Sequence, residues 1–284
     1  MPTPALPTAS VPGPVPTDTP RRRPNGIALL RGVPETLSHC ELTHRQREPI
    51  DLGRAVAQHA AYGELLRSLG LHVVELPADP AFPDCCFVED TAVVLDEVAL
   101  VAMPGAASRR GELDAVAEAL ARFRPLERTA LPATIEGGDV LRVGRTVFVG
   151  RSPRTNEAGI ARLRAFAEPL GYAVVPVEVT GCLHLKSAAT ALDHERVLAN
   201  TDWIDAAPFS GFDLVPVAAG EPGAANVLRV AGLVVAHSGF PRTLERISAL
   251  GYAVHPLDVS EFVKAEAALT CKSLLFRELG SRSD

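Results

Sequence analysis

The sequence lacks the features that would tie it to a membrane or to nucleic acid. No apolar run approaches the roughly 20 residues that a membrane-spanning helix needs. The net charge is −6 and the pI is near 5.8, so the chain has no basic signature for nucleic-acid binding. With 47% hydrophobic and 22% charged residues, the composition is that of an ordinary globular protein, and we expect it to be soluble.

Cysteine is also scarce, and its spacing indicates neither disulfides nor metal. The chain of 284 residues has five, Cys40, Cys85, Cys86, Cys182 and Cys271, an odd number that does not form a disulfide framework. It has no Cys-x-x-Cys pair, no pair of histidines at i and i+4 and no glycine-rich phosphate loop. We therefore expect no metal, no organic cofactor and a reducing, cytoplasmic location.

The N-terminal residues differ in composition from the rest of the chain. Residues 1–24 are rich in proline and threonine, contain Arg21–Arg22–Arg23 and lack the apolar core of a secretory signal. We predict a disordered proline-rich tail over residues 1–24, followed by a single catalytic domain over residues 25–284. The sequence leaves monomer and homodimer open.

An amphipathic helix, a glycine and a short β-rich run recur along the chain. Three clear copies have Gly70, Gly171 and Gly251 after a stripe of apolar residues at helical spacing, and a shorter copy begins at Gly211. Glycine suits the left-handed position that ends a helix, so each copy predicts a helix followed by a strand. The apolar stripe of the first helix comprises Leu52, Val56, Leu65, Leu66 and Leu69.

A predicted hairpin follows each unit, with turn-type residues between its two strands. The predicted pairs are 88–94 with 98–102, 140–143 with 146–149, 188–192 with 197–198, and 227–230 with 233–236. A fifth strand over 269–276 can pair with an N-terminal strand over 26–30.

Reactive residues occupy a common position at the starts of these hairpins. The second positions are Glu89, Glu136, His184, Asn226 and Cys271, at intervals of 47, 48, 42 and 45 residues. A period in this range predicts a repeat architecture. If five units close into a ring, these positions converge on its axis, and we predict a functional site there.

Taken singly, each of these residues also has a structural explanation. A cysteine such as Cys271 is commonly a small buried hydrophobe, and His184 could be a hydrogen-bonded structural histidine. The glycines after Glu136 could simply form a turn. The shared repeat position favours function, because independent structural residues have no reason to coincide there.

The residue types indicate a particular chemistry. A thiolate beside an imidazole is a nucleophile with its proton carrier. Surrounding carboxylates would repel an oxyanion but would pair with a planar guanidinium cation. We therefore predict attack on the guanidinium carbon of an arginine-like small molecule, with Cys271 as nucleophile and His184 as proton carrier.

Several separated motifs, in chain order, resemble those of the dimethylarginine dimethylaminohydrolases of the guanidino-modifying pentein superfamily. The resemblance extends from about Gly26 to Phe276. It rests on residues 31–35, 76–79, 83–84, 87–94, 104–110, 136–141, 154–156, 183–187 and 269–271. It implies a five-bladed α/β propeller of pseudo-fivefold ββαβ repeats over the domain at 25–284.

The resemblance also implies an activity and a set of roles. The activity is hydrolysis of Nω-methylated arginines to citrulline and a methylamine through a covalent thiouronium on Cys271, with no cofactor. His184 matches the proton donor and Glu136 the carboxylate that orients it. The positions that match substrate-binding residues are Leu42, Asp84, Glu89, Asp90, Arg109, Arg154 and Ala265, where Glu89 and Asp90 bracket the guanidinium and the others hold the amino-acid end.

Two other classes of function remain as alternatives. One is an arginine deiminase-like or agmatine-type hydrolase, although Arg109 and Arg154 favour a substrate that carries an α-carboxylate. The other is a non-catalytic binding protein on the same fold, which would be expected to lack Cys271, His184 and Glu136.

Overall fold

Five three-stranded sheets repeat along the chain. The computed structural model describes residues 26–279, so the tail predicted over residues 1–24 lies outside the described residues. In each sheet the middle strand pairs parallel with the strand that follows it and antiparallel with its other neighbour, which precedes it in four sheets and comes from the C-terminal end of the chain in the first. The sheets are β15 (Leu274–Phe276), β1 (Ile27–Arg31) and β2 (His72–Leu76); β3 (Ala92–Val94), β4 (Ala99–Val101) and β5 (Leu126–Arg128); β6 (Val140–Val143), β7 (Thr146–Arg151) and β8 (Ala173–Glu178); β9 (Ala189–Ala191), β10 (Arg196–Ala199) and β11 (Asp213–Pro216); and β12 (Leu228–Val230), β13 (Leu233–His237) and β14 (Ala253–Leu257).

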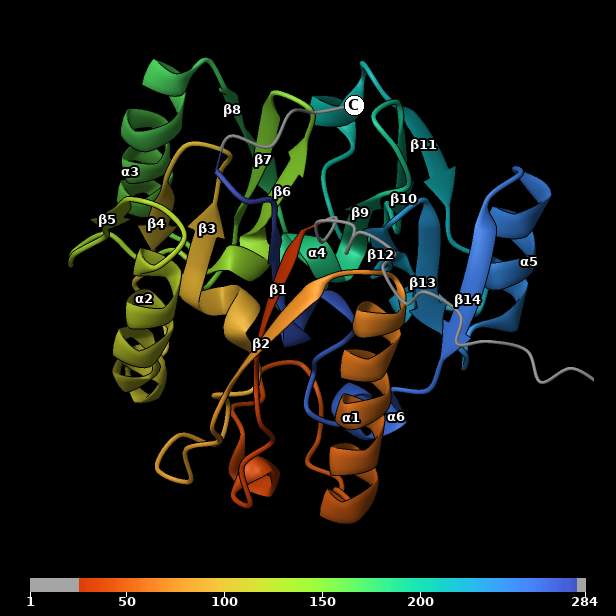
Figure 1. Ribbon diagram of the computed structural model, residues 1–284. Helices are drawn as coiled ribbons and strands as arrows, with labels where there is room; N and C mark the ends of the chain where they lie inside the picture. Colours follow the sequence, from red (N-terminus) through yellow and green to blue (C-terminus); the bar gives the residue numbers. More distant parts are fainter. Residues whose placement is uncertain (1–25, 280–284) are drawn as a thin grey trace, which may run out of the picture.

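A helix connects the two parallel strands in four of the five units. These helices are α1 (Leu52–Ser68), α2 (Leu113–Ala121), α3 (Glu157–Ala167) and α5 (Pro241–Ala249), and they lie around the outside of the sheets (Figure 1). The fourth unit has only a 3-10 turn, Ala207–Phe209, in this place. Within residues 26–279, no helix combines the length and apolar character needed to cross a bilayer.

Apolar cores between neighbouring sheets close the five units into a ring. One core packs Ile27 and Leu29 of the first sheet against Ala92 and Ala99 of the second. Similar cores follow between the later sheets. The last joins Val235 of the fifth sheet back to α1 and β1 of the first. The predicted five-bladed α/β propeller is therefore confirmed.

Two predicted inner strands, 88–94 and 269–276, begin too early, whereas the strand predicted over 140–143 is confirmed and those over 188–192 and 227–230 begin within one residue of β9 and β12. The early starts concern the site itself. One turn of helix precedes the inner strand of each sheet: η2 (Val88–Thr91), η4 (Gly137–Asp139), α4 (Leu185–Ala188), η7 (Pro222–Ala225) and η8 (Thr270–Lys272). The five shared positions lie within these turns or beside them, not in the strands. Short apolar runs do not distinguish a strand from a single helical turn, so periodicity alone could not place this boundary.

Two further expectations for the helical units were wrong or incomplete. Val56 was assigned to the apolar stripe of α1, but it is 47% exposed, whereas Ala55, Tyr62 and Leu66 form the buried face. The unit of α2 and β5 was missed because Arg124-Pro125, not a glycine, separates its helix from its strand.

Candidate active site

A narrow cavity of about 20 Å³ lies where the helical turns meet at the axis of the ring. It is lined by Glu41, Asp84, Phe87, Asp90, Arg109, Arg154, Leu183, His184, Ala265, Glu266, Ala267 and Cys271. Seven of the ten predicted site residues are in this lining. Of the other three, Glu136 lies behind His184, Glu89 faces a second cavity, and Leu42 is next to the lining residue Glu41.

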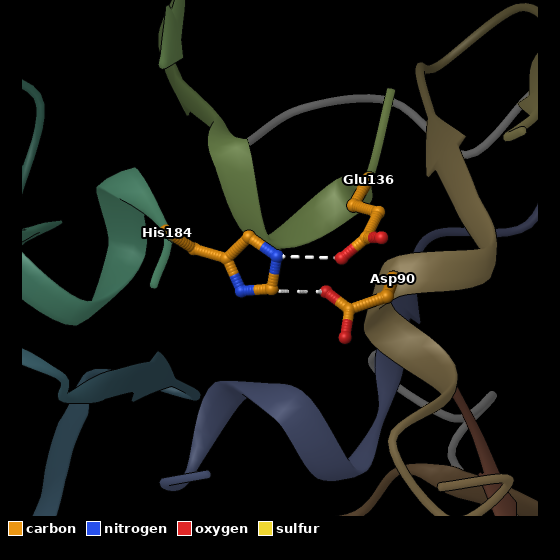
Figure 2. A group of neighbouring side chains, drawn as sticks. All are labelled: Asp90, Glu136 and His184. Carbon is orange, nitrogen blue, oxygen red and sulfur yellow. Dashed lines mark hydrogen bonds and ion pairs between the residues drawn. The ribbon is translucent and has the colours of Figure 1, made fainter. Parts of the chain in front are cut away.

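His184 is held between two buried carboxylates. Its Nε2 lies 2.7 Å from Oε2 of Glu136, and its Nδ1 lies 3.9 Å from Oδ1 of Asp90 (Figure 2). Burial alone would lower the pKa of His184, but the charges of Asp90, Glu136 and Asp139 and the hydrogen bond with Glu136 outweigh it and raise the pKa to about 9. The imidazole is therefore a cation at neutral pH and can act as a general acid.

Backbone groups fix the carboxylate of Glu136. Its Oε1 accepts the N–H of Gly105 at 3.0 Å, and its own N–H donates to Oγ1 of Thr155 at 3.2 Å. The two glycines that follow are required by close packing. A Cβ on Gly138 would lie 2.6 Å from Asp90 Oδ1 and 2.7 Å from His184 Nδ1, and one on Gly137 would lie 1.9 Å from the carbonyl oxygen of Glu89. These glycines allow turn η4 to lie close against turn η2 and His184.

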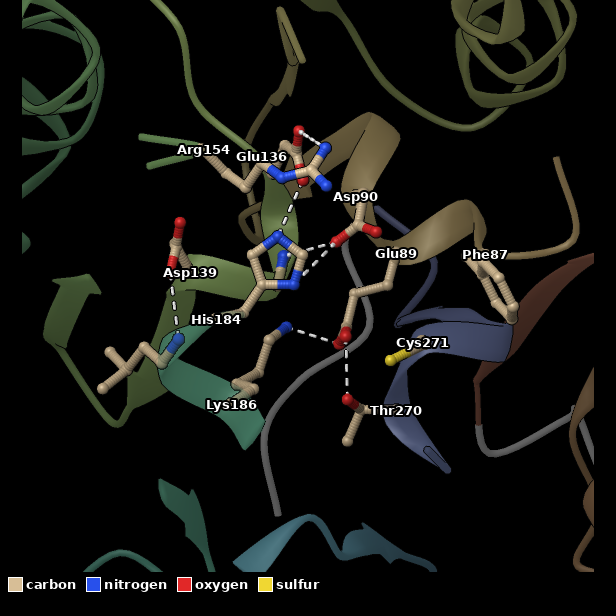
Figure 3. A network of polar contacts seen from close by, with 12 residues as sticks. Phe87, Glu89, Asp90, Glu136, Asp139, Arg154, His184, Lys186, Thr270 and Cys271 are labelled. Carbon is tan, nitrogen blue, oxygen red and sulfur yellow. Dashed lines mark hydrogen bonds and ion pairs between the residues drawn. The ribbon is translucent and has the colours of Figure 1, made fainter. Parts of the chain in front are cut away.

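Cys271 is partly exposed to the cavity and lies in turn η8 (Figure 3). Its Sγ accepts the N–H of Ala268 at 3.4 Å. Burial and the negative charges of Glu89 and Asp90 raise the pKa of this thiol to about 12. The resting cysteine is therefore neutral at pH 7, and a cation entering the cavity would favour its ionisation.

Arg109 is bonded to the carboxylate that was predicted to hold a guanidinium. Its Nη1 donates to Oδ2 of Asp90 at 2.6 Å, and its Nε and Nη2 donate to Glu112 at 3.2 and 2.9 Å. Nη2 also donates to the carbonyl of Phe87 at 3.1 Å. With these partners the buried guanidinium orders the turn that carries Asp90, and little of it is left to bind a substrate carboxylate.

A second buried network separates the candidate site from a larger cavity. Glu89 accepts a hydrogen bond from Lys186 at Oε1 and from Thr270 Oγ1 at Oε2, the latter at 2.7 Å (Figure 3). Asn226, at the fourth shared position, donates to the carbonyl of Lys186 and to Thr270 Oγ1, both at 2.9 Å. The cavity beyond them, about 460 Å³, is lined by Glu89 and Lys186 together with the inner strands of the five sheets.

The segment that contains Leu42 lies over the candidate site and is held by its walls. The carboxylate of Asp84 accepts the N–H of Glu41 at 3.1 Å, and Arg154 Nη2 donates to Oγ1 of Thr43 at 3.2 Å. The carboxylate of Glu266 accepts the backbone N–H groups of three successive residues, 43 to 45. Glu266 has a φ of 55°, a backbone conformation that is uncommon for a residue other than glycine.

Asp90, Glu136 and His184 are also the one set of described histidine, cysteine and acidic residues that gathers closely enough to hold a metal ion, with ligand atoms within 4.8 Å of one another. In this arrangement the imidazole Nε2 is hydrogen-bonded to Glu136, and Asp90 is paired with Arg109. The contacts are those of an acid–base pair with its supporting charges.

Comparison with known proteins gives a consistent family. The family model described as N,N dimethylarginine dimethylhydrolase, eukaryotic, matches residues 38–201. The chain is 42% identical over 259 residues to the N(G),N(G)-dimethylarginine dimethylaminohydrolase of Streptomyces coelicolor, covering 90% of this chain and 99% of that protein. The corresponding Pseudomonas aeruginosa protein is 36% identical over 228 residues, which cover 80% of this chain and 90% of that protein. The chain belongs to the dimethylarginine dimethylaminohydrolase family.

Solved structures agree with this family assignment. A cysteine-to-serine variant of the Pseudomonas aeruginosa family member, in complex with citrulline, superposes with a TM-score of 0.84 at 34% identity, covering 88% of this chain and 98% of that chain. The N-terminal domain of a cyanobacterial arginine dihydrolase has a TM-score of 0.80 at 17% identity, a likeness that supports the fold alone.

Several supporting residues were not found from the sequence. Asp139 accepts the N–H of Leu185 at 2.9 Å and Oγ of Ser152 at 2.6 Å, and so fixes the turn after His184. Glu112 and Lys186 are the partners of Arg109 and Glu89. A single sequence does not show these pairings, because Lys186 lies 97 positions from Glu89, and Glu112, although only three positions from Arg109, belongs to no motif that marks it. Only the placement of Asp139 within the Glu136 motif could have indicated it.

Proposed function

We propose that this protein hydrolyses Nω-methylated arginines to citrulline and a methylamine through a covalent intermediate on Cys271. The observation that carries the proposal is the convergence of Cys271, His184 and the carboxylate of Asp90 on one cavity, with Glu136 behind the histidine. A thiol, a protonated imidazole and carboxylates suit a cationic electrophile, because carboxylates pair with guanidinium. The names of the relatives point to the same substrate class.

The first half-reaction consumes one proton at the leaving group. Substrate binding brings a guanidinium close to Cys271, offsets the charges of Glu89 and Asp90 and lowers the pKa of the thiol. The thiol proton passes to solvent, and the thiolate adds to the guanidinium carbon. His184, already an imidazolium, gives its proton to the methylated nitrogen, and the C–N bond breaks to release a neutral amine and leave an S-alkylthiouronium on Cys271.

The second half-reaction restores the enzyme. His184, now neutral, takes a proton from a water molecule as its oxygen attacks the thiouronium carbon. The C–S bond then breaks, the remaining hydroxyl proton passes to the departing sulfur, and citrulline is released from an enzyme whose Cys271 is again a thiol. One imidazole serves first as acid and then as base, and Glu136 keeps its ring in place for both steps.

Steady-state kinetics of citrulline release tests this proposal. The substrates are dimethylarginine, monomethylarginine, arginine and agmatine, compared as kcat/KM. We expect the methylated arginines to exceed arginine and agmatine by at least about tenfold, which corresponds to about 1.4 kcal/mol of transition-state discrimination. A preference for free arginine would instead identify a deiminase, and one for agmatine would show that no α-carboxylate is recognised.

A further inference from the structure

Lys272, the residue after Cys271, is completely buried. Its Nζ lies 4.8 Å from the ring centroid of Tyr62 and 5.0 Å from that of Phe262, and it donates to the carbonyl oxygen of Ala268 at 3.0 Å. Lys272 belongs to turn η8, together with Cys271. Its ammonium is enclosed behind the nucleophile.

Burial at this position is unfavourable for a charged lysine. No carboxylate of the described residues 26–279 forms an ion pair with Lys272, and a buried ammonium without a counter-ion is costly even over aromatic rings. The chain contains 25 arginines but only three lysines, Lys186, Lys264 and Lys272. Arginine keeps its proton in proteins, whereas a buried lysine can lose it. The residue type and its burial together indicate a role that packing alone does not explain.

The contacts of Lys272 lead to the sulfur of Cys271 through one residue. Ala268 accepts the lysine Nζ–H at its carbonyl and donates its N–H to Cys271 Sγ. Glu89 and Asp90 disfavour the thiolate, whereas the Ala268 N–H and the Lys272 charge favour it. Lys272 and Ala268 therefore form a single unit that opposes the carboxylates of the cavity.

We propose that Lys272 is a positioning residue for the nucleophile, whose buried ammonium holds Ala268 against Cys271 and favours the thiolate over the thiol. The inference rests on the proposed role of Cys271. It extends that role by naming a source of positive charge on the protein side of the sulfur, opposite the side from which the guanidinium arrives.

The proposal has a consequence for pH dependence. Burial lowers the pKa of Lys272 to about 7, and formation of the Cys271 thiolate opposes this shift. Below pH 7 the charged lysine favours the thiolate, and above pH 7 this help is lost as the lysine becomes neutral. The other groups that face Lys272 are His59 and Tyr62 of α1, Phe262 of α6 (Ser260–Val263), Cys86 and Glu89 before β3, and His237 of β13.

Alkylation of Cys271 by iodoacetamide, followed by mass spectrometry of the peptide between pH 5.5 and 10, tests this directly. In the wild-type protein we expect the logarithm of the rate to rise with pH, flatten near pH 7 and rise again. The flattening follows because each thiolate gained is then offset by loss of the lysine charge. A single uninterrupted rise through pH 7 would overturn the proposal, and this test needs no variant.

Two substitutions separate charge from hydrogen bonding. Lys272→Met keeps the stem over the rings and removes both, while Lys272→Gln keeps an N–H donor for Ala268. We expect both variants to lose the flattening near pH 7 and to be alkylated at least about tenfold more slowly at pH 6, with rates that converge on the wild type above pH 9. If Lys272→Gln kept the wild-type pH profile of alkylation, the charge of Lys272 would have no effect on ionisation of Cys271.

A matched control and an independent assay complete the experiment. Lys264→Met removes another lysine, one whose Nζ bonds Glu261 and the carbonyl of Pro49, and should leave the alkylation profile unchanged. Alkylation requires no substrate. If the wild type releases no citrulline from methylarginines, the proposed function fails and the lysine test remains valid. If citrulline is released but the flattening is absent, this inference alone is wrong.

Discussion

His184 Nε2 and Glu136 Oε2 lie 2.7 Å apart, with the histidine 4% exposed and the glutamate fully enclosed. Since Gly105 N–H also holds Glu136, the carboxylate cannot turn away, and the imidazole ring keeps one orientation with Nδ1 on its other side. A fixed, protonated imidazole next to a thiol that resists ionisation means that the substrate's own charge completes the site.

Cys271→Ser should abolish citrulline formation without unfolding the protein. A serine hydroxyl in this carboxylate-rich cavity is a far weaker nucleophile than a thiolate, and loss of a nucleophile costs several orders of magnitude in kcat. The measurement is citrulline release, with circular dichroism as the check on folding. Cys85→Ala, which alters a buried cysteine outside the cavity lining, serves as control and should stay within a few-fold of the wild type. Residual Cys271→Ser activity above roughly one per cent would contradict the covalent mechanism.

Replacing Arg154 by alanine should affect catalysis differently from replacing Arg109 by alanine. The guanidinium of Arg154 has one hydrogen bond, to Thr43, and lies 3.7 Å from Glu136, so Arg154→Ala should mainly raise KM for methylarginines, by roughly 10- to 100-fold for a charge-assisted bond. Arg109→Ala should instead lower kcat and the melting temperature, because it leaves Asp90 and Glu112 buried without their partner. Nω-methylagmatine, which lacks the carboxylate, provides the control for Arg154→Ala. An equal loss with both substrates would place carboxylate binding elsewhere.

Glu266→Ala should loosen the segment that lies over the cavity. The Glu266 carboxylate is the shared acceptor for the N–H groups of residues 43 to 45. Its removal therefore takes away three hydrogen bonds that hold this segment. We expect faster tryptic cleavage after Arg45 and Arg47, and a higher KM because the neighbouring Leu42 is a predicted substrate-binding residue. Glu266→Gln, which keeps the acceptor oxygen but not the charge, should lie between Ala and wild type. Unchanged cleavage in Glu266→Ala would show that Asp84 and Arg154 suffice to hold the segment.

The sequence predicted the architecture well because the repeat shows in its own spacing. Glu89, Glu136, His184, Asn226 and Cys271 fall at one position of five units, and the structure places all five in or beside the helical turns at the ring axis. The partners of these residues were harder to predict from the sequence. Arg109 was assigned to a substrate carboxylate, yet it bonds Asp90 across 19 positions and Glu112 on the same turn. A single sequence shows which charges are present but not which of them neutralise each other.

The free energy of unfolding should depend on pH through the raised pKa of His184. The folded pKa of His184 is about 9, above the value of about 6.5 expected for an unfolded chain. A raised pKa means that the folded state binds the proton more tightly. The contribution to the free energy of unfolding is therefore complete below pH 6.5 and is lost as the pH rises through 9, on the order of 3 kcal/mol in all.

Urea unfolding of the wild type and of His184→Gln at pH 6, 7.5 and 9 measures this contribution. Lys272 acts with the opposite sign, because its pKa is lowered to about 7 and its burial costs most when it is charged. That cost is common to both proteins and cancels when the variant is subtracted from the wild type. We expect the difference to shrink steadily from pH 6 to pH 9, whereas His194→Gln, at a histidine side chain that is 79% exposed, should differ from wild type by the same small amount throughout. A difference for His184→Gln that does not change with pH would mean that the imidazole is neutral in the folded protein, and the first proton of the proposed reaction would then have to come from another group.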